Sequence, residues 1–301
     1  MTYSIVARDP VTGQLGVAAQ SCYFALGSVL PWARAGVGAV ATQSMVDPGY
    51  GPRCLDLLAQ GVPVADALEQ VRAADPGREV RQVGLVDIHG QVASFTGSRC
   101  IDEVSEARGN GYTAQANMMR GPGVCPAMAH AFETTPGSLA SRLMAALVAA
   151  EGAGGDGRGV MSAALQVVDA EPRDHPWEGV LVDVRVDHHD DPLGELDRLL
   201  RVAEAYHHCD LAEEALVRGD TAMALAESQA ALALLPGEGN FMLSYIGALA
   251  STGRVAEAAT AAQDLVRRQP GWDGMLRAIV ARGLVPLPEG VTIEALLEEA
   301  P

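Results

Sequence analysis

The first part of the chain alternates groups of strand-like segments with pairs of helix-like segments, and this order constrains the fold more than any other feature. The strand-like segments are short and are joined by turns such as Asp87-Ile88-His89-Gly90, which are typical of antiparallel pairing. Strands are expected at residues 3–8, 15–21, 29–33, 37–44, 82–87, 91–96, 112–119, 162–169 and 180–186, and helices at 52–60, 64–74, 126–134 and 138–151. This order predicts an α+β fold in which helices stack on sheets.

After Asp187 the pattern changes. The segment His188-His189-Asp190-Asp191-Pro192 is polar and ends in proline, which is typical of a junction. Almost everything after it is Ala- and Leu-rich, acidic and helix-like. The sequence therefore predicts two domains, an α+β domain over residues 1–190 and an all-helical domain over residues 191–301.

The helical part contains an internal repeat. LAEEALVRGDTAMALAESQAALALLPG, which begins at Leu211, can be aligned with YIGALASTGRVAEAATAAQDLVRRQPG, which begins at Tyr245. Gly219 aligns with Gly253, and this pair is 34 residues apart. A helix pair with this period is the signature of tetratricopeptide repeats, and we expect flanking helices at residues 194–206 and 272–282 to complete the stack.

Charge and composition exclude several classes of protein. The formal net charge is −17, from 38 acidic and 21 basic residues, so the surface repels nucleic acid and anionic membranes. The sequence shows neither a signal peptide nor a membrane span. Five scattered cysteines without a CxxC pair indicate reduced thiols rather than disulfides or a zinc ribbon. We therefore expect a cytoplasmic protein without nucleic-acid or membrane partners.

The first strand-like segment carries the most specific chemical hypothesis. Thr2 follows Met1 directly and begins the strand-like run that includes Tyr3, Ile5 and Val6. Removal of Met1 would leave Thr2 with a free α-amino group beside its own hydroxyl. That amine, whose ordinary pKa is about 7.7–8.0, can take the hydroxyl proton and so activate the oxygen as a nucleophile. The alternative is that Thr2 is an ordinary strand residue without chemistry.

The motifs TYSIVARDP, LGVAAQS, PWARAGVGAVATQ, GYGPRCLDLLAQG and GGDGRG resemble those of a bacterial family, domain of unknown function 1028. This family is grouped in the N-terminal nucleophile (Ntn) hydrolase superfamily, and the resemblance covers roughly residues 2–187. The resemblance implies a four-layer αββα sandwich and an amide hydrolase with Thr2 as the nucleophile. Residues after about 192 are similar to the C-terminal segment of such proteins, for which a peptidoglycan-binding role has been suggested.

One departure from the superfamily concerns the residue beside the nucleophile. The proteasome-type branch of the superfamily uses a lysine beside the nucleophile, and this chain contains no lysine. Arg34 follows a strand at a comparable position but cannot share a proton as lysine does. Arg34 could instead lower the pKa of the terminal amine or hold a substrate carboxylate. The alternative is that it is a plain surface or salt-bridged residue.

Further residues are candidates for binding substrate or stabilising charge. Asn117 is expected on a strand and is a candidate oxyanion donor, with Thr42 as a further one; Ser21 ends the strand after the first turn. The glycines of the GGDGRG loop would let backbone N–H groups approach a ligand closely, and Asp156 and Arg158 are candidates for orienting it. The alternative for Asn117 is a polar strand residue that bonds to the backbone. The alternative for the GGDGRG loop is a flexible connection between a helix and a strand. Cys22 is disfavoured as a nucleophile because the sequence places no histidine near it.

The sequence contains two histidine pairs, His188-His189 and His207-His208, and histidine is a residue type that binds metal ions. Adjacent residues point in different directions, so we expect solvated junctions rather than a zinc site, and we expect no metal or cofactor. The predicted partners are a small-molecule or peptide amide substrate and a protein or muropeptide bound by the helical tail. Self-association is also compatible with the apolar helices. The alternative function is a non-catalytic platform whose tail does the binding.

Overall fold

The computed structural model describes residues 2–101, 103–285 and 287–298. The chain divides into two compact units, residues 1–200 and residues 201–301. The division falls inside helix α5 (Pro192–Arg218). The sequence places its domain boundary at residues 190 and 191, before this helix begins, and that assignment stays a prediction.

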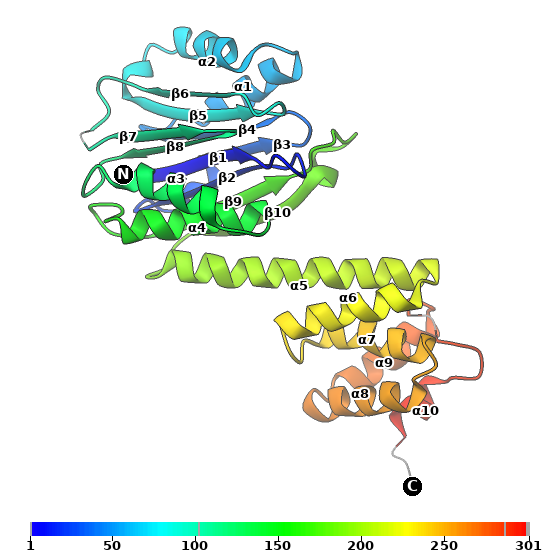
Figure 1. The fold of residues 1–301 in the computed structure, drawn as a ribbon. Coiled ribbons are helices and arrows are strands. Elements are labelled where there is room, and N and C mark those ends of the chain that lie inside the picture. The colour runs from blue at the N-terminus through cyan, green and yellow to red at the C-terminus, as the bar shows by residue number, and fades with distance from the viewer. Residues whose placement is uncertain (1, 102, 286, 299–301) are drawn as a thin grey trace. The chain divides into compact units, whose positions relative to one another are not determined.

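The described strands of the first unit form two antiparallel sheets (Figure 1). A six-stranded sheet has the order β10-β9-β2-β1-β8-β7, and a four-stranded sheet has the order β3-β4-β5-β6. The strands are β1 (Thr2–Arg8), β2 (Leu15–Ser21), β3 (Pro31–Arg34), β4 (Gly38–Ser44), β5 (Arg81–Asp87), β6 (Val92–Thr96), β7 (Ser105–Gly109), β8 (Tyr112–Asn117), β9 (Ser162–Val168) and β10 (Val180–Val186).

Helices cover one face of each sheet. Helices α1 (Tyr50–Ala59) and α2 (Val64–Ala73) contact the four-stranded sheet, whereas α3 (Val124–Thr134) and α4 (Leu139–Gly152) contact the six-stranded sheet. The two sheets contact each other through β1, β2, β4 and β5, so the first unit is layered helix, sheet, sheet, helix (Figure 1). The expected α+β class and the expected helix pairs are confirmed.

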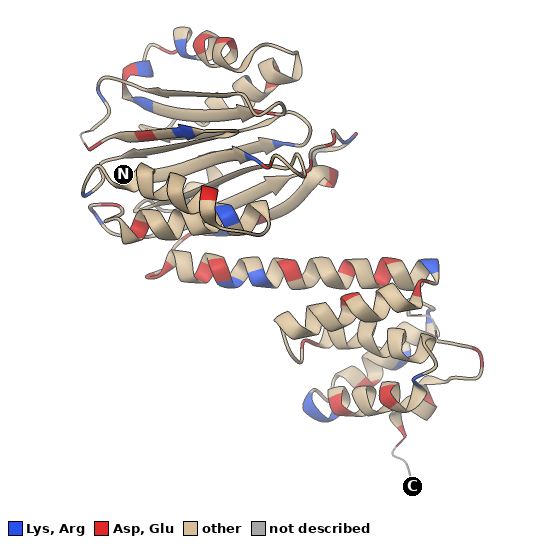
Figure 2. Ribbon diagram, in the orientation of Figure 1, with Lys and Arg blue, Asp and Glu red and all other residues tan. Residues whose placement is uncertain are grey.

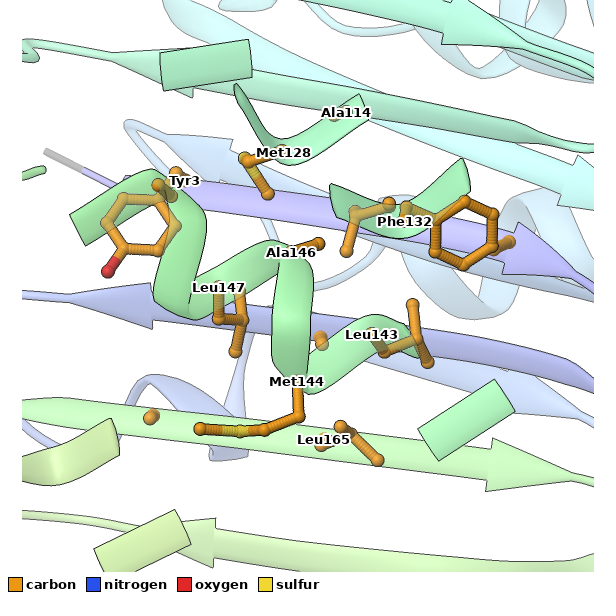
Figure 3. Packing of buried hydrophobic residues seen from close by; sticks show 14 of the residues in the cluster. Tyr3, Ala114, Met128, Phe132, Leu143, Met144, Ala146, Leu147 and Leu165 are labelled. Carbon is orange, nitrogen blue, oxygen red and sulfur yellow. The ribbon is translucent and has the colours of Figure 1, made fainter. Parts of the chain in front are cut away.

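Strand β1 contributes to two cores because its side chains alternate between the faces of the sheet. Tyr3, Ile5 and Ala7 pack with α3 and α4, as Figure 3 shows for Tyr3 beside Met128 and Leu147. Residues of even number point the other way, and Val6 belongs to the apolar cluster between the sheets. The same alternation places Thr2 on the side of the second sheet.

The sequence patterns miss one strand and misplace the end of another. β7 has the sequence Ser-Glu-Ala-Arg-Gly and is an edge strand that pairs only with β8, so it shows no apolar alternation. β8 ends at Asn117 rather than at residue 119, because Met118 adopts a left-handed backbone with φ 59°. A strand cannot continue through that conformation.

Among the described residues of the second unit, the regular secondary structure is all α-helix. It contains the end of α5 together with α6 (Thr221–Leu234), α7 (Gly239–Ser251), α8 (Val255–Arg268), α9 (Trp272–Ala281) and α10 (Ile293–Leu297). None of the described helices combines the length and the apolar character that crossing a membrane requires. Figure 2 shows acidic residues on helices of both units, and every basic residue there is an arginine.

The 34-residue repeat is visible in the backbone of this unit. Helices α6 and α8 each have 14 residues, and their starts are 34 residues apart. Gly219 and Gly253 precede them with φ 77° and 80°. Their N–H groups donate to the carbonyls of Leu216 and Ala250, which are again equivalent positions. The aligned segments therefore form the same helix–turn–helix unit twice.

We predict that Gly51→Ala destabilises the first unit. Gly51 lies in α1, and a Cβ added there would be 2.1 Å from Cγ of the Trp32 indole. Overpacking of this kind costs about 1–3 kcal/mol of the free energy of unfolding, measurable by urea denaturation. The control is Gly152→Ala at the end of α4, where a Cβ would meet nothing within 4 Å. Equal stability of the two variants would contradict the packing argument.

We also predict that Asp75 stabilises the first unit in a pH-dependent way. Arg81 Nε donates to its carboxylate at 2.9 Å, and the Tyr50 hydroxyl and the Gly77 N–H also donate to it. The bond from Arg81 is the main reason that the pKa of Asp75 lies below its ordinary value. Its contribution is therefore complete above the unfolded-state pKa of about 3.9 and is lost as the pH falls through the lowered folded-state pKa.

The variant Asp75→Asn should lose about 1–3 kcal/mol of unfolding free energy at pH 7, because it removes a buried charged acceptor. Urea denaturation of wild type and variant should show this difference narrowing at acid pH. The control is Asp174→Asn, which changes an exposed carboxylate. A difference in stability that does not change with pH would contradict the role of the ionised carboxylate.

Candidate active site

Thr2 lies where the central strand of the six-stranded sheet begins. In the sheet register it is opposite Ser21, the last residue of β2, and Asn117, the last residue of β8. Its side chain is buried on the side of the second sheet, with the residue 8% exposed. The Oγ1 atom of Thr2 lies 3.0 Å from Oγ of Ser21, within hydrogen-bond distance. The sheet thus fixes a threonine hydroxyl at a strand end.

A cavity of about 550 Å³ opens beside this hydroxyl. It forms where β1 and β5 begin and where β2 and β4 end, together with the loops that follow these strands. Its described lining residues are Thr2, Ser21, Tyr23, Leu26, Val29, Leu30, Thr42, Gln43, Ser44, Met45, Val46, Val80, Arg81, Arg99, Ile101, Met118 and Arg158. A volume of this size suits a small molecule or a few residues of a peptide.

Three amide side chains connect the beginning of β1 to both sheets. Nε2 of Gln43 lies 3.3 Å from the carbonyl oxygen of Thr2 and donates to Oε1 of Gln82 at 2.7 Å. Nδ2 of Asn117 donates to the same oxygen of Gln82 at 2.9 Å. Gln82 in turn donates to the carbonyl of Ala116 at 3.0 Å. All of these side chains are buried, so the network holds Thr2 in a fixed position.

The GGDGRG loop is anchored by a buried carboxylate. Asp156 is 1% exposed and accepts hydrogen bonds from the N–H of Cys22 at 3.0 Å and from the N–H of Arg158 at 2.8 Å. Nη2 of Arg158 also lies 3.2 Å from this carboxylate. The loop thereby places Arg158 at the cavity, next to the end of β2.

Glycine is required at one position of this loop. Gly155 has φ 54°, and a Cβ there would lie 2.2 Å from Oε2 of Glu151. The same Oε2 accepts a hydrogen bond from the Tyr3 hydroxyl at 3.0 Å. Burial, followed by the charge of Glu151, raises the pKa of Tyr3 well above its ordinary value, so Tyr3 stays neutral. The loop and β1 are therefore linked through Glu151.

Two residues other than glycine line the cavity with a left-handed backbone. Ser44 has φ 70° at the end of β4, and Met118 has φ 59° directly after β8. This conformation costs about 1–2 kcal/mol for a residue with a Cβ. Both residues turn the chain away from its sheet at the point where the cavity opens. Strain of this kind is often found at functional sites.

The structure brings together most of the site residues that the sequence suggested. Thr2, Ser21, Thr42 and Arg158 line one cavity, and Asp156 holds the loop that carries Arg158. Asn117 is not a lining residue, because its Nδ2 points to Gln82.

Arg34 lies elsewhere, at the end of β3. It pairs with Asp56 of α1 at 2.8 Å and is not among the lining residues. This is the ordinary salt bridge that the sequence analysis left open as the alternative.

Sequence reasoning missed two arginines of the cavity, Arg81 and Arg99. Arg81 begins β5 and could have been noticed only as a charge beside a strand. Arg99 lies in a Gly- and Ser-containing loop without periodicity, where no pattern relates it to Thr2. Both reach the site through tertiary contacts between segments far apart in the chain.

The histidine pairs do not form a recognisable metal site. Nδ1 of His208 lies 2.6 Å from Glu227, and Nδ1 of His189 accepts the N–H of Asp191 at 2.9 Å. Among the described residues, no group of three His, Cys, Asp or Glu side chains is arranged to hold a metal ion. The five cysteines are free thiols, and Cys22 is half-buried beside the GGDGRG loop.

The chain is similar to members of a known protein family. The model of the family described as "Family of unknown function (DUF1028)" matches residues 2–196. The crystal structure of protein SPO2555 from Silicibacter pomeroyi, assigned to the same family, is 35% identical with a TM-score of 0.61 and covers 67% of this chain and 85% of its own. A search of curated proteins gave no match. The chain therefore belongs to the DUF1028 family, whose function is unknown.

Proposed function

We propose that this protein is an N-terminal nucleophile hydrolase that cleaves an amide bond in a small molecule or peptide, with Thr2 as the nucleophile after removal of Met1. The observation that carries the proposal is the position of the Thr2 hydroxyl at the wall of the cavity, at the start of the central strand. The helix–sheet–sheet–helix layers agree with the αββα sandwich that the resemblance to this superfamily implies.

The chemistry needs only Thr2 and water. The free α-amine takes the proton from the hydroxyl while Oγ1 attacks the amide carbon, and a tetrahedral oxyanion forms. The ammonium then gives its proton to the leaving nitrogen as the C–N bond breaks, which leaves an ester on Thr2. Water, deprotonated by the same amine, hydrolyses that ester and restores the hydroxyl. Because the chain has no lysine, the amine is the base in both halves of the reaction.

Neighbouring groups position the nucleophile. The Ser21 hydroxyl, 3.0 Å from Oγ1, orients the Thr2 hydroxyl, and Gln43 holds the Thr2 carbonyl. Asn117 acts through Gln82 and is a positioning residue in this proposal. Arg158 and Thr42 line the same cavity, which supports a role for them in binding substrate. Arg34 has no part in the proposal, because it lies outside the cavity.

We predict that Thr2→Ala abolishes amide hydrolysis, with a loss of at least about 10³-fold in kcat, because no other group takes over as nucleophile. Turnover would be measured on a panel of fluorogenic amides, with intact mass and N-terminal sequencing used to establish that Met1 is absent. Thr134→Ala, an exposed threonine at the end of α3, is the matched control. Undiminished turnover by purified Thr2→Ala would rule out the mechanism.

A second function is proposed for the helical tail. The repeated unit of α5–α6 and α7–α8 supports tetratricopeptide-like helix pairs, which bind proteins or peptides on their surfaces. A non-catalytic platform would act through this surface, with a protein, peptide or muropeptide as partner.

Calorimetric titration with a muropeptide tests the tail directly. Binding should be present in the full chain and in Thr2→Ala, and absent from a chain that lacks residues 201–301. Binding that survives this deletion would locate the muropeptide site outside the tail.

A further inference from the structure

The cavity at Thr2 has a charge opposite to that of the chain as a whole. The chain carries 38 acidic and 21 basic residues, yet the described lining residues include three arginines and no aspartate or glutamate. In a protein with this composition, an acid-free concave site is selective toward anions. A cationic ligand would find no carboxylate among these lining residues.

The three arginines are not equivalent. Arg81 pairs with Asp75 at 2.9 Å, and Arg158 pairs with Asp156 at 3.2 Å, so each of these charges is already balanced. Arg99 is different, because its exposed guanidinium has no hydrogen-bond or ion-pair partner among the described residues.

Glu79, the described acidic residue whose backbone pairs with that of Arg99, is already engaged through its carboxylate. Glu79, whose carbonyl accepts the N–H of Arg99, directs its carboxylate to the N–H and hydroxyl of Ser98 at 3.1 and 2.8 Å. Arg78 also lies 3.5 Å from this carboxylate. The positive charge of Arg99 is therefore left for a ligand.

The rest of the wall is mainly apolar. The aliphatic and thioether side chains of the lining are Leu26, Val29, Leu30, Met45, Val46, Val80, Ile101 and Met118. A ligand that fills this cavity buries hydrocarbon against these groups. One unbalanced guanidinium beside an apolar wall suits a carboxylate, which an arginine binds through two parallel hydrogen bonds.

Resting on the function proposed above, we infer that the substrate is a small amide that carries both an aliphatic segment and a carboxylate, with the carboxylate bound by Arg99. N-acyl amino acids and short apolar peptides with a free C-terminus have this chemistry. The aliphatic segment lies against the apolar wall, and the scissile amide faces Thr2. Arg99 thus determines specificity and takes no part in the bond-breaking steps.

The test measures binding separately from turnover. Full-length Thr2→Ala would be titrated calorimetrically with N-octanoylglycine and with N-octanoylglycinamide, which differ in charge but hardly in shape. We expect the acid to bind at least 10-fold more tightly than the amide. Adding Arg99→Gln should remove this preference, whereas Arg34→Gln, which changes a half-buried arginine outside the cavity, should preserve it. Added salt should weaken binding of the acid alone.

The outcomes separate this inference from the proposed function. Equal binding of the two ligands, absence of binding by both, or a preference unchanged in Arg99→Gln would overturn the inference. Hydrolysis by wild type that depends on Thr2 but is indifferent to the carboxylate would also overturn it, while leaving the proposed function intact. A preference for the acid together with no hydrolysis by the chain that begins at Thr2 would leave the anion site standing and reject the catalytic proposal.

Discussion

The pairing of β1 with β2 on one side and β8 on the other is the interaction on which the rest of the first unit depends. A backbone buried in the middle of a sheet must form its hydrogen bonds with neighbouring strands. β1 does so over its whole length, from Thr2 to Arg8. The beginning of a chain is usually free to move, but here the pairing fixes Thr2 between β2 and β8. A short side chain at that position acquires the rigidity that a site needs.

Much of the fold follows from local patterns, whereas the arrangement of the site does not. The alternation of Tyr3, Ile5 and Val6 with the turn at Asp9 is sufficient to predict β1 and β2, and the 34-residue spacing of Gly219 and Gly253 is sufficient to predict the repeated helix pairs. Local patterns contain no information on which strands become neighbours. The pairing of β1 with β8, more than a hundred residues later, required the structure.

The candidate site illustrates the same limit. Thr2 and Ser21 could be associated from the sequence because they belong to one hairpin. Arg34 looked suitable because it follows a strand at a position comparable to that of the lysine in the superfamily that the sequence resembles, but it lies at the end of β3 and pairs with Asp56 of α1. No pattern in the sequence relates Arg99 to Thr2, yet Arg99 lines the same cavity. The arginines that line the cavity lie near Thr2 because of the tertiary structure, and not because they are close to it in sequence.

The space between the sheets is unusually polar at the end that holds Thr2. Gln43, Gln82 and Asn117 occupy positions where the opposite end has Val6, Val17 and other apolar residues. The side-chain oxygens of Gln43 and Asn117 are buried without a hydrogen-bond partner among the described residues. Such groups cost stability. The buried amide side chains at this end of the sandwich therefore lower the stability of the fold while they hold Thr2 in position.

The identical turns at Gly219 and Gly253 have a consequence for how the tail can change in length. Because each turn is followed by a helix of the same length, 14 residues, the turn and its helix recur in the same order in both repeats. Insertion or removal of one whole repeat keeps this order of turns and helices. A change of any other length disrupts the packing of one helix pair against the next. Related chains whose helical tails differ in length should therefore differ by whole repeats of 34 residues.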